Sequence, residues 1–411
     1  MKHLILLLGV LLSLSLFGQK KRKLNYYYST SQEIIKNQRS STEQKLALIG
    51  AYKQALLMAD TSGGSNDTEH YLKEDDKSYI ISLLPVNAID YIAERAPQEQ
   101  IIMINEAHHS SLHRYFTYSL LDTLYAKGFR YLGLETLNYR DSLLNERKYP
   151  VINSGYYTRD PVFGDMVRYA LNLGFTVFAY EAREHLTEYI YKDGYLNVSR
   201  GRTVEREIRQ AFNIMRILKI EPDAKILIHA GYGHICENPH NMGYYAHLLS
   251  NINPLTIEQT VLSEKSAKKY EEPAYRLMDF EEPVVLIDTL NNDSVFIGGN
   301  YNKRGHQVDV SICHPRTHYI YNRPEWMSFS GRRKPYFTDE KSLPNAYPFL
   351  ILAYYEHEYE AFQQDAIPVD IAEYKKHKEK TCLFLPPGEF TLIFKGKNNE
   401  ILKKSKIEIS P

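Results

Sequence analysis

Four short clusters of glutamate and histidine residues could carry acid–base chemistry in this chain. The first is Asn105–His109 (Asn-Glu-Ala-His-His), followed by Glu135, by Glu181, and by His229–His234 (His-Ala-Gly-Tyr-Gly-His). Glutamate and histidine transfer protons near neutral pH once their surroundings have tuned their pKa values. Ionisable side chains that gather in one cleft often mark a functional site. The clusters therefore predict a site of proton transfer, provided that the fold brings them together.

The residue types within these clusters favour hydrolysis of an ester or amide bond. We expect Glu106 and Glu135 to position or deprotonate a water molecule. His109 and His234 would act as the general base and the general acid, and Glu181 would orient a neighbouring side chain. The expected substrate is a small molecule or a peptide.

A divalent metal ion is the alternative use of the same histidines. If a helix begins near Ser110, His109 and His113 lie one turn apart and could chelate a metal, with His234 as a third ligand. The glutamate that stands between the two histidines of helical zinc proteases is missing, because the three residues between them are serine, serine and leucine. The spacing therefore leaves both metal-assisted and metal-free chemistry open.

Short apolar runs that alternate with helical patterns must position these clusters. The runs cover residues 101–105, 131–135, 176–181 and 225–230, and the helical patterns cover 112–127, 161–173 and 203–218. This alternation predicts an α/β fold with a mostly parallel sheet and helices on both faces, which 284–288 and 308–312 would extend. Ligands bind beyond the carboxyl ends of the strands in such sheets. We therefore expect the four clusters to converge at one edge of the sheet.

The flanking segments differ in texture from this central region. Residues 20–95 show helical spacing at 46–57 and 79–95, which predicts a helical N-terminal segment. Alternating strands dominate beyond residue 335 and predict a small β-sandwich domain at 336–411. The α/β domain would then cover residues 96–335.

A lysine excess marks the end of the chain. Residues 373–411 carry nine lysines against five acidic residues. Lysines often keep the exposed edges of sheets soluble. A solvated strand face is therefore the favoured interpretation, and a specific anionic partner is the alternative.

The first nineteen residues have the pattern of a secretory signal peptide. Lys2 precedes an apolar run from Leu4 to Leu16, and small and polar residues follow it. The run is shorter than the roughly 20 residues that span a bilayer. We expect cleavage of residues 1–19 and export to the periplasm or the medium, with an uncleaved membrane anchor as the alternative.

Bulk composition narrows the function classes. The chain has 411 residues, with 50 Lys and Arg against 50 Asp and Glu, so its formal net charge is zero. Proteins that bind nucleic acid by bulk electrostatics usually carry a basic excess, so we expect no nucleic-acid partner. Three cysteines are too few for a disulfide framework in a chain of this size.

The clusters, in this order, resemble the superfamily that joins erythromycin esterase-like hydrolases, haem-uptake (ChaN-like) lipoproteins and Tiki/TraB proteases. Asn105–His109 is similar to the Gly-Glu-x-x-His of the esterase branch, and Glu135 matches its second strand end. Arg206–Asn213 resembles its Arg-Asp-x-x-Met-Ala-x-Asn helix, and His229–His234 resembles its closing Trp-Ala-His-Asn-Gly-His. Asn105 replaces the leading glycine and Gly231 replaces the first closing histidine. The resemblance covers roughly residues 96–330.

This resemblance implies an exported hydrolase, or alternatively a non-catalytic protein that binds haem or iron, as in the haem-uptake branch. Tyrosine can ligate haem iron, and the chain contains 34 tyrosines. A degenerate scaffold whose C-terminal domain attaches it to a partner is a third possibility. The matches leave open whether His108 or His109 is the equivalent residue. The residues expected to bind substrate or support the site are His108, Glu181, Arg206, Tyr232 and His229.

Overall fold

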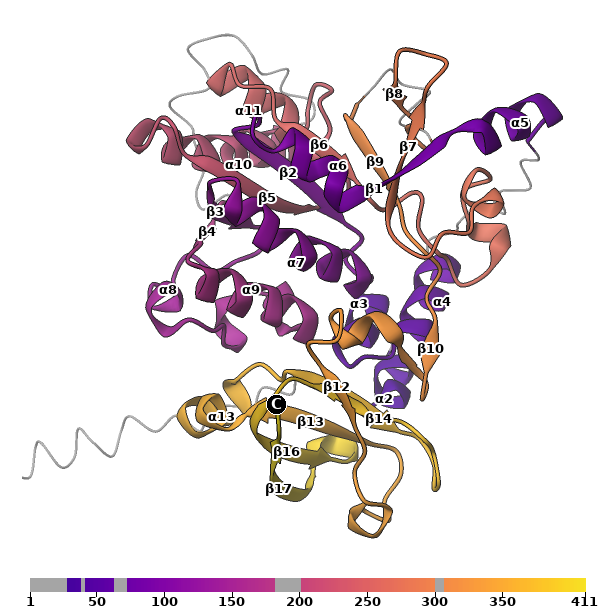
Figure 1. Ribbon diagram of the computed structural model, residues 1–411. Helices are drawn as coiled ribbons and strands as arrows, with labels where there is room; N and C mark the ends of the chain where they lie inside the picture. The colour runs from indigo at the N-terminus through magenta and orange to yellow at the C-terminus, as the bar shows by residue number, and fades with distance from the viewer. Residues whose placement is uncertain (1–27, 38–40, 63–71, 182–200, 300–306) are drawn as a thin grey trace, which may run out of the picture.

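The computed structural model describes residues 28–37, 41–62, 72–181, 201–299 and 307–411 (Figure 1). The predicted signal peptide at 1–19 lies outside these residues. Among the described residues, no helix is both long enough and apolar enough to cross a membrane.

A nine-stranded, mainly parallel sheet forms the centre of the molecule. Its strand order is β1-β7-β9-β6-β2-β5-β3-β4, and β8 pairs with β7. The strands are β1 (Leu84–Asn87), β2 (Ile101–Glu106), β3 (Phe129–Leu134), β4 (Thr176–Ala179), β5 (Lys225–Gly231), β6 (Leu255–Glu258), β7 (Val284–Asp288), β8 (Ser294–Val295) and β9 (Val310–Cys313). All pairs from β9 to β4 are parallel, whereas β7 and β1 join antiparallel at one end. The predicted mixed α/β fold with a mainly parallel sheet is confirmed.

Helices cover both faces of this sheet (Figure 1). In β2, Ile102 and Ile104 belong to one core and Ile101 and Met103 to the other, because successive strand residues point to opposite faces. The first core includes α6 (Ala88–Arg95), α7 (Ser111–Ala126) and α9 (Pro161–Leu173). The second includes α10 (Gly201–Ile220) and α11 (Met242–Ser250). Every residue of β2 is buried, as expected for a strand covered on both sides.

The N-terminal segment is mostly helical but contributes one strand to the central sheet. Its helices are α2 (Ser31–Lys36), α3 (Thr42–Leu48), α4 (Tyr52–Ser62) and α5 (Glu74–Ser82). The helix predicted over 79–95 is wrong as a continuous element, because α5 ends at Ser82 and β1 separates it from α6. Pro85 lies in β1, and a proline inside a helix removes a backbone donor and clashes with the preceding turn.

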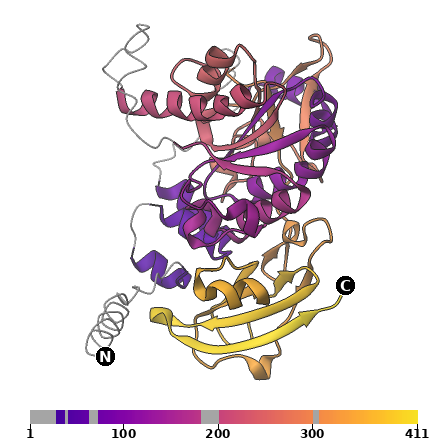
Figure 2. The same cartoon turned by 90° about the vertical axis from the view of Figure 1, so that its left-hand side faces the viewer.

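Small antiparallel sheets form the C-terminal part. Strands β14 (Asp370–Tyr374), β13 (Phe349–Tyr355), β16 (Gly388–Lys395) and β17 (Ile401–Ile409) pair in that order, and β12 (Lys334–Tyr336) pairs with β15 (Leu383–Leu385). One face of the larger sheet packs against β12 and β15. The other face packs against helices α2–α4 (Figure 2). The two ends of the described chain therefore share one apolar core, and the predicted division at residues 95 and 335 stays a prediction.

Candidate functional site

The four predicted clusters meet at the carboxyl edge of the central sheet. Glu106 ends β2 and lies opposite Gly231, the last residue of β5, in the parallel register. Glu135 follows β3, whose last residue Leu134 lies opposite His229 of β5. Glu181 follows β4 by two residues. Because the carboxyl ends of neighbouring parallel strands lie side by side, their side chains form one polar group.

Glu106 is the buried carboxylate that supports this group of side chains. Arg114 of α7 donates to it twice, from Nε to Oε2 at 2.6 Å and from Nη2 to Oε1 at 2.9 Å. Arg114 Nη1 also lies 2.8 Å from Asp160, which caps the N-terminus of α9 by accepting from Val162 and Phe163. Burial alone would raise the pKa of Glu106, but the charge and hydrogen bonds of Arg114 hold that pKa well below its usual value. Glu106 is therefore an ionised, rigid support.

Two histidines use the remaining hydrogen-bonding capacity of Glu106. Nδ1 of His108 lies 3.1 Å from Oε1, and Nε2 of His229 lies 2.9 Å from Oε2. His229 is buried, and its other nitrogen contacts Thr117 Oγ1 at 3.0 Å. The His108 ring stacks on Tyr157 with a centroid distance of 4.5 Å. Since the His108 side chain keeps 15% of its surface exposed, it is the member of this pair that solvent can reach.

Glu135 lies at the centre of the site. Its Oε2 accepts from the backbone N–H of Gly231 at 2.5 Å, and its Oε1 accepts from Arg206 Nη2 at 2.8 Å. Nε2 of His234 lies 3.5 Å from the same Oε1. Burial would raise the pKa of Glu135, but His234, His108 and Arg206 lower it to about 2. Glu135 is therefore a carboxylate at neutral pH.

His234 forms a second carboxylate–histidine pair. Its Nδ1 lies 2.8 Å from Glu207, which also accepts from the backbone N–H of Met242 at the start of α11. Burial would lower the pKa of His234, but its hydrogen bonds and charge interactions with Glu135 and Glu207 raise it to about 9. Arg206 Nη1 lies 3.0 Å from Nε2. A charged ring can donate from Nε2 to Glu135, and a neutral ring can accept from Arg206, so both protonation states have a partner.

Arg206 is fixed by Glu181. Arg206 Nε donates to Glu181 Oε1 at 2.9 Å, and Arg206 Nη2 donates to Glu181 Oε2 at 2.6 Å. Gln210 donates to the same carboxylate at 3.1 Å. Bidentate contacts of this kind set the orientation of a guanidinium group. Glu181 thus has the geometry that its predicted orienting role requires. Arg206 brings a positive charge beside Glu135 and His234.

The absence of a side chain at Gly231 leaves the space that the His108 and Glu135 side chains occupy. A Cβ atom at this position would lie 2.0 Å from Cε1 and 2.6 Å from Nε2 of His108, and 2.9 Å from Oε2 of Glu135. No side chain fits there without moving one of them. Gly231 is thus the residue against which His108 packs.

Two predicted site residues lie away from the carboxylates. His109 contacts Tyr232, whose hydroxyl is 3.5 Å from Nδ1, and burial together with the charge of Lys265 lowers the pKa of His109 to about 3. His113 points into the core, where Nδ1 accepts from Ala107 N–H at 3.0 Å and Nε2 lies 3.0 Å from Ser263 Oγ. It is therefore His108, and not His109, that the fold brings to Glu106.

The metal site predicted from His109, His113 and His234 is not assembled. Within the part of the chain that the structure describes, no group of three or more histidine, cysteine, aspartate or glutamate residues could hold a metal ion. The expected one-turn spacing does not produce a chelating pair, because α7 begins at Ser111 and the His113 ring is used by hydrogen bonds in the core.

Sequence reasoning missed several residues of this site. They are Arg114, Asp160, Glu207 and Tyr157. Asp160 precedes Pro161, a common signature of a helix start that predicts a cap but not a contact with Arg114. Glu207 is adjacent to Arg206 in sequence, and neighbouring helix residues usually point in different directions. Only the fold shows that both contact His234.

Part of the fold of this protein is similar to solved structures of other proteins. No protein-family model matches the chain, and no curated protein matches it in sequence. The structure of ChaN of Campylobacter jejuni with cofacially bound haem aligns with a TM-score of 0.33 and 10% identity, over 55% of this chain and 92% of that one. The type III effector HopBA1 aligns with a TM-score of 0.30 and 13% identity, over 44% of this chain and 87% of that one.

A third solved structure is RRSP, a MARTX toxin effector domain from Vibrio vulnificus. It aligns with a TM-score of 0.29 and 14% identity, over 54% of this chain and 46% of that one. Similarity at this level concerns part of the fold and assigns a role to no residue of this chain. The functional argument therefore depends on the geometry of the site.

Proposed function

We propose that this protein is an exported hydrolase that cleaves an ester or amide bond in a small molecule or peptide by acid–base chemistry. One observation carries the proposal: the carboxylate–histidine pairs Glu106–His108 and Glu207–His234 both adjoin Glu135. A histidine that is oriented through one nitrogen by a buried carboxylate can transfer protons through the other.

His108 serves as the general base in this mechanism. Glu106 engages Nδ1, so Nε2 is left to take a proton from a water molecule. The ideal Cβ position at Gly231 lies 2.6 Å from this Nε2 and 2.9 Å from Glu135 Oε2, which places both atoms beside one point. A water activated by His108 Nε2 would attack the carbonyl carbon of the substrate. This assigns to His108 the role that the sequence suggested for His109.

His234 serves as the general acid. Because its pKa is about 9, the ring is charged at neutral pH and can give the Nε2 proton to the departing oxygen or nitrogen. Arg206 then stabilises the negative charge that develops on the carbonyl oxygen, as preorganised cations do in acyl transfer. The proton held by His108 goes to solvent and His234 regains a proton from solvent, so that one water has been added across the bond and both histidines are reset. A metal-assisted variant would need ligands other than the three predicted histidines.

Hydrolysis assays on purified protein test this proposal. The substrates are a series of p-nitrophenyl esters and a set of peptide amides, and the variants are His108→Ala, His234→Ala and Glu135→Gln. Each variant is expected to lose roughly a hundredfold or more in kcat/KM, the usual contribution of a general acid or base. His247→Ala, exposed on α11, is the matched control.

Two results would contradict the acid–base proposal. One is the absence of turnover on any substrate, and the other is an equal loss in His247→Ala and His108→Ala. Activity that survives EDTA supports metal-free chemistry. Stoichiometric bound metal that is lost in Glu106→Ala supports the metal-assisted variant.

Haem or iron binding is the second candidate function. The half-exposed Tyr232 hydroxyl lies beside His109 Nδ1, and tyrosine and histidine are both haem-iron ligands. Titration with haem tests this directly. A Soret shift in the wild type that is lost in Tyr232→Phe would support it, and an unchanged spectrum at micromolar haem would remove it.

A further inference from the structure

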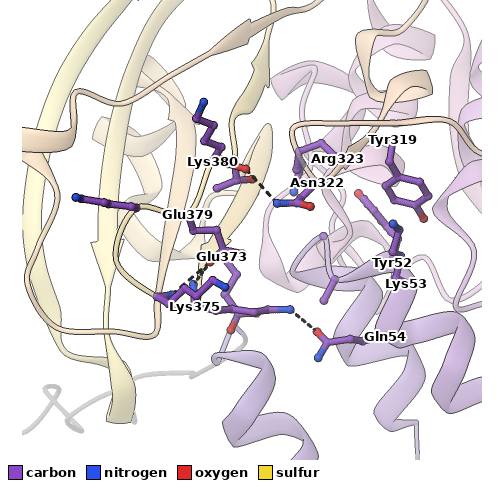
Figure 3. Close-up of a pocket in the computed structure, with 15 residues that line it drawn as sticks. Tyr52, Lys53, Gln54, Tyr319, Asn322, Arg323, Glu373, Lys375, Glu379 and Lys380 are labelled. Carbon is purple, nitrogen blue, oxygen red and sulfur yellow. Dashed lines mark hydrogen bonds and ion pairs between the residues drawn. The ribbon is translucent and has the colours of Figure 1, made fainter.

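A cavity of about 450 Å³ lies between the N-terminal helices and the C-terminal sheet, away from the candidate site (Figure 3). Three parts of the chain line it: the start of α4, the hairpin of β10 (Tyr319–Ile320) and β11 (Arg323–Pro324), and the loop between β14 and β15. Lys375 Nζ donates to Gln54 Oε1 at 3.1 Å and connects the loop to α4. Small-molecule sites are typically cavities of about 300–1,000 Å³.

The lining of this cavity is strongly basic. Its charged residues are Lys53, Arg323, Lys375, Lys376, Lys378, Lys380, Glu373 and Glu379. Arg323 forms an ion pair with the buried Asp370, which leaves five lysines against two carboxylates, a difference of +3. Like charges repel when they gather on one surface, and a bound anion relieves that repulsion. The cavity is therefore suited to a negatively charged ligand.

Seven of the nine lysines in residues 373–411 fall into two structurally different sets. On the edge strand β17, Lys403 donates to Ser342 O at 2.8 Å, Lys404 lies over the Tyr359 ring, and Lys406 pairs with Glu356. These are the solvated edge lysines that the sequence favoured. The other set is the four exposed lysines of the β14–β15 loop, which contribute to the lining of the cavity.

Most of the loop lysines have no internal counter-charge. Among the described residues, no carboxylate lies within ion-pair distance of Lys376, Lys378 or Lys380. The two carboxylates of the cavity already have partners, and Glu373 lies 3.9 Å from Lys375 Nζ. Glu379 accepts from the backbone N–H groups of Lys375 and Lys376, and Glu373 accepts from Ser31 N–H at 2.6 Å.

The start of α4 adds backbone donors to the same cavity. Tyr52, Lys53 and Gln54 form the first turn of this 11-residue helix and line the cavity. The first amides of a helix have no acceptor within the helix, and its N-terminus carries partial positive charge, which together favour phosphate. Lys53 lies over the Tyr319 ring at 3.8 Å, so its ammonium group stays at the cavity wall.

We propose that this cavity binds a small ligand that carries a phosphate or diphosphate group, with Lys376, Lys378 and Lys380 as its main charge partners. Lysine binds phosphate as a point charge, and the cavity leaves room for an organic part beyond the anion. The phosphate can belong to a free metabolite or to the terminal unit of a phosphorylated polymer. The proposal does not depend on the hydrolase activity.

Calorimetric titration tests the proposal with inorganic pyrophosphate, a medium-chain polyphosphate and acetate. Pyrophosphate represents a free phosphorylated ligand and polyphosphate represents a phosphate carried on a polymer. The test variant is the triple Lys376→Gln, Lys378→Gln, Lys380→Gln. Because each exposed ion pair contributes modestly and three are removed together, the triple is expected to weaken pyrophosphate binding by about tenfold or more.

The matched control removes the same charge elsewhere. Lys36, Lys127 and Lys397 are exposed and do not line the cavity, so their triple exchange to Gln changes the net charge equally. The proposal is supported if phosphate ligands bind the wild type and the control triple variant equally but do not bind the triple variant of the cavity lysines. If polyphosphate binds more tightly than pyrophosphate, and this difference is lost in the triple variant of the cavity lysines, the natural phosphate group belongs to a polymer.

Two outcomes would overturn the proposal. One is a wild type that does not bind pyrophosphate or polyphosphate more tightly than acetate at millimolar concentration. The other is an equal loss of affinity in the two triple variants, which would reduce the effect to bulk charge. Thermal melting of each variant checks that these exposed substitutions leave the fold intact.

Discussion

Arg114 meets Glu106 through two parallel hydrogen bonds, of 2.6 and 2.9 Å, at a place where each side chain is only 1% exposed. Removal of one member of a buried ion pair leaves an uncompensated charge and costs about 3–5 kcal/mol of unfolding free energy. We predict a loss of that order for Arg114→Met, measured by urea denaturation. Asp160, which also contacts Arg114, would lose a partner at the same time.

The control for this variant is Arg140→Met, since Arg140 is exposed. It should change the unfolding free energy by less than about 0.5 kcal/mol, as surface substitutions usually do. The double variant Arg114→Met, Glu106→Gln should recover part of the stability because it removes both charges. A single variant as stable as wild type would contradict the account of Glu106 as a support held by Arg114.

Gly231→Ala should disable the site while the adjacent Gly233→Ala does not. The alanine Cβ at 231 would lie 2.0 Å from His108, whereas a Cβ at 233 meets only Cys236 Sγ, at an ordinary 3.8 Å. Displacement of His108 breaks its contact with Glu106, and overpacking typically costs about 1–3 kcal/mol. Circular dichroism and ester hydrolysis measured side by side are expected to show a folded, inactive Gly231→Ala. Equal activity in the two variants would disprove the role of His108.

The pKa of His234 predicts a loss of stability in mild alkali. Its folded value of about 9 lies above the unfolded value of about 6.5, so its contribution is complete below pH 6.5 and lost as the pH rises through 9. The contribution is on the order of 2–3 kcal/mol and is shared with Glu135, since both pKa shifts report one interaction. Urea midpoints of wild type should therefore fall between pH 6.5 and 9. His234→Gln should lack this fall, and His247→Gln should keep it.

Two buried histidines and the half-buried His109 predict acid sensitivity. Burial lowers the pKa of His109 and His314 to about 3 and lowers the pKa of His113 well below its usual value. The unfolded chain takes up protons on these rings below pH 6.5 and the folded chain does not. Stability should then fall by up to ~1.4 kcal/mol per pH unit for each ring.

Unfolding free energies at pH 7, 6 and 5 measure this slope. His314→Gln should reduce the slope by about one proton, and the exposed His318→Gln should leave it unchanged. If both variants titrate like wild type, the buried rings are not the cause of the acid sensitivity.

The sequence predicts the strands of the site well because their residues are buried on both faces. Continuous apolar runs such as Ile101–Ile104 have few other stable environments, and each ends in a residue of the site. Two strands of the central sheet, β1 and β6, were not predicted. Strands β1 and β6 have four residues each, and Pro85 argues against a strand assignment from sequence alone.

The assignment of individual site residues was less predictable than the fold. His108 and His109 are neighbours with the same chemistry, and the choice between them depends on how the chain turns from β2 into α7. Asp160 and Arg114 are 46 residues apart and meet only because α9 packs beside α7. The hydrophobic periodicity of a sequence describes one helix or strand at a time. It therefore does not predict contacts that depend on how two helices pack together.

The shared core of helices α2–α4 and the C-terminal sheet sets an order for folding during synthesis. The apolar faces of these helices leave the ribosome early, whereas β13 and β16 follow only after residues 349 and 388 have been made. Until then Leu46 and Ile49 have no sheet to cover them, and such surfaces are prone to aggregate. The C-terminal strands therefore cover the apolar faces of helices α2–α4. A chain that is shortened at its C-terminus loses the sheet against which these N-terminal helices pack.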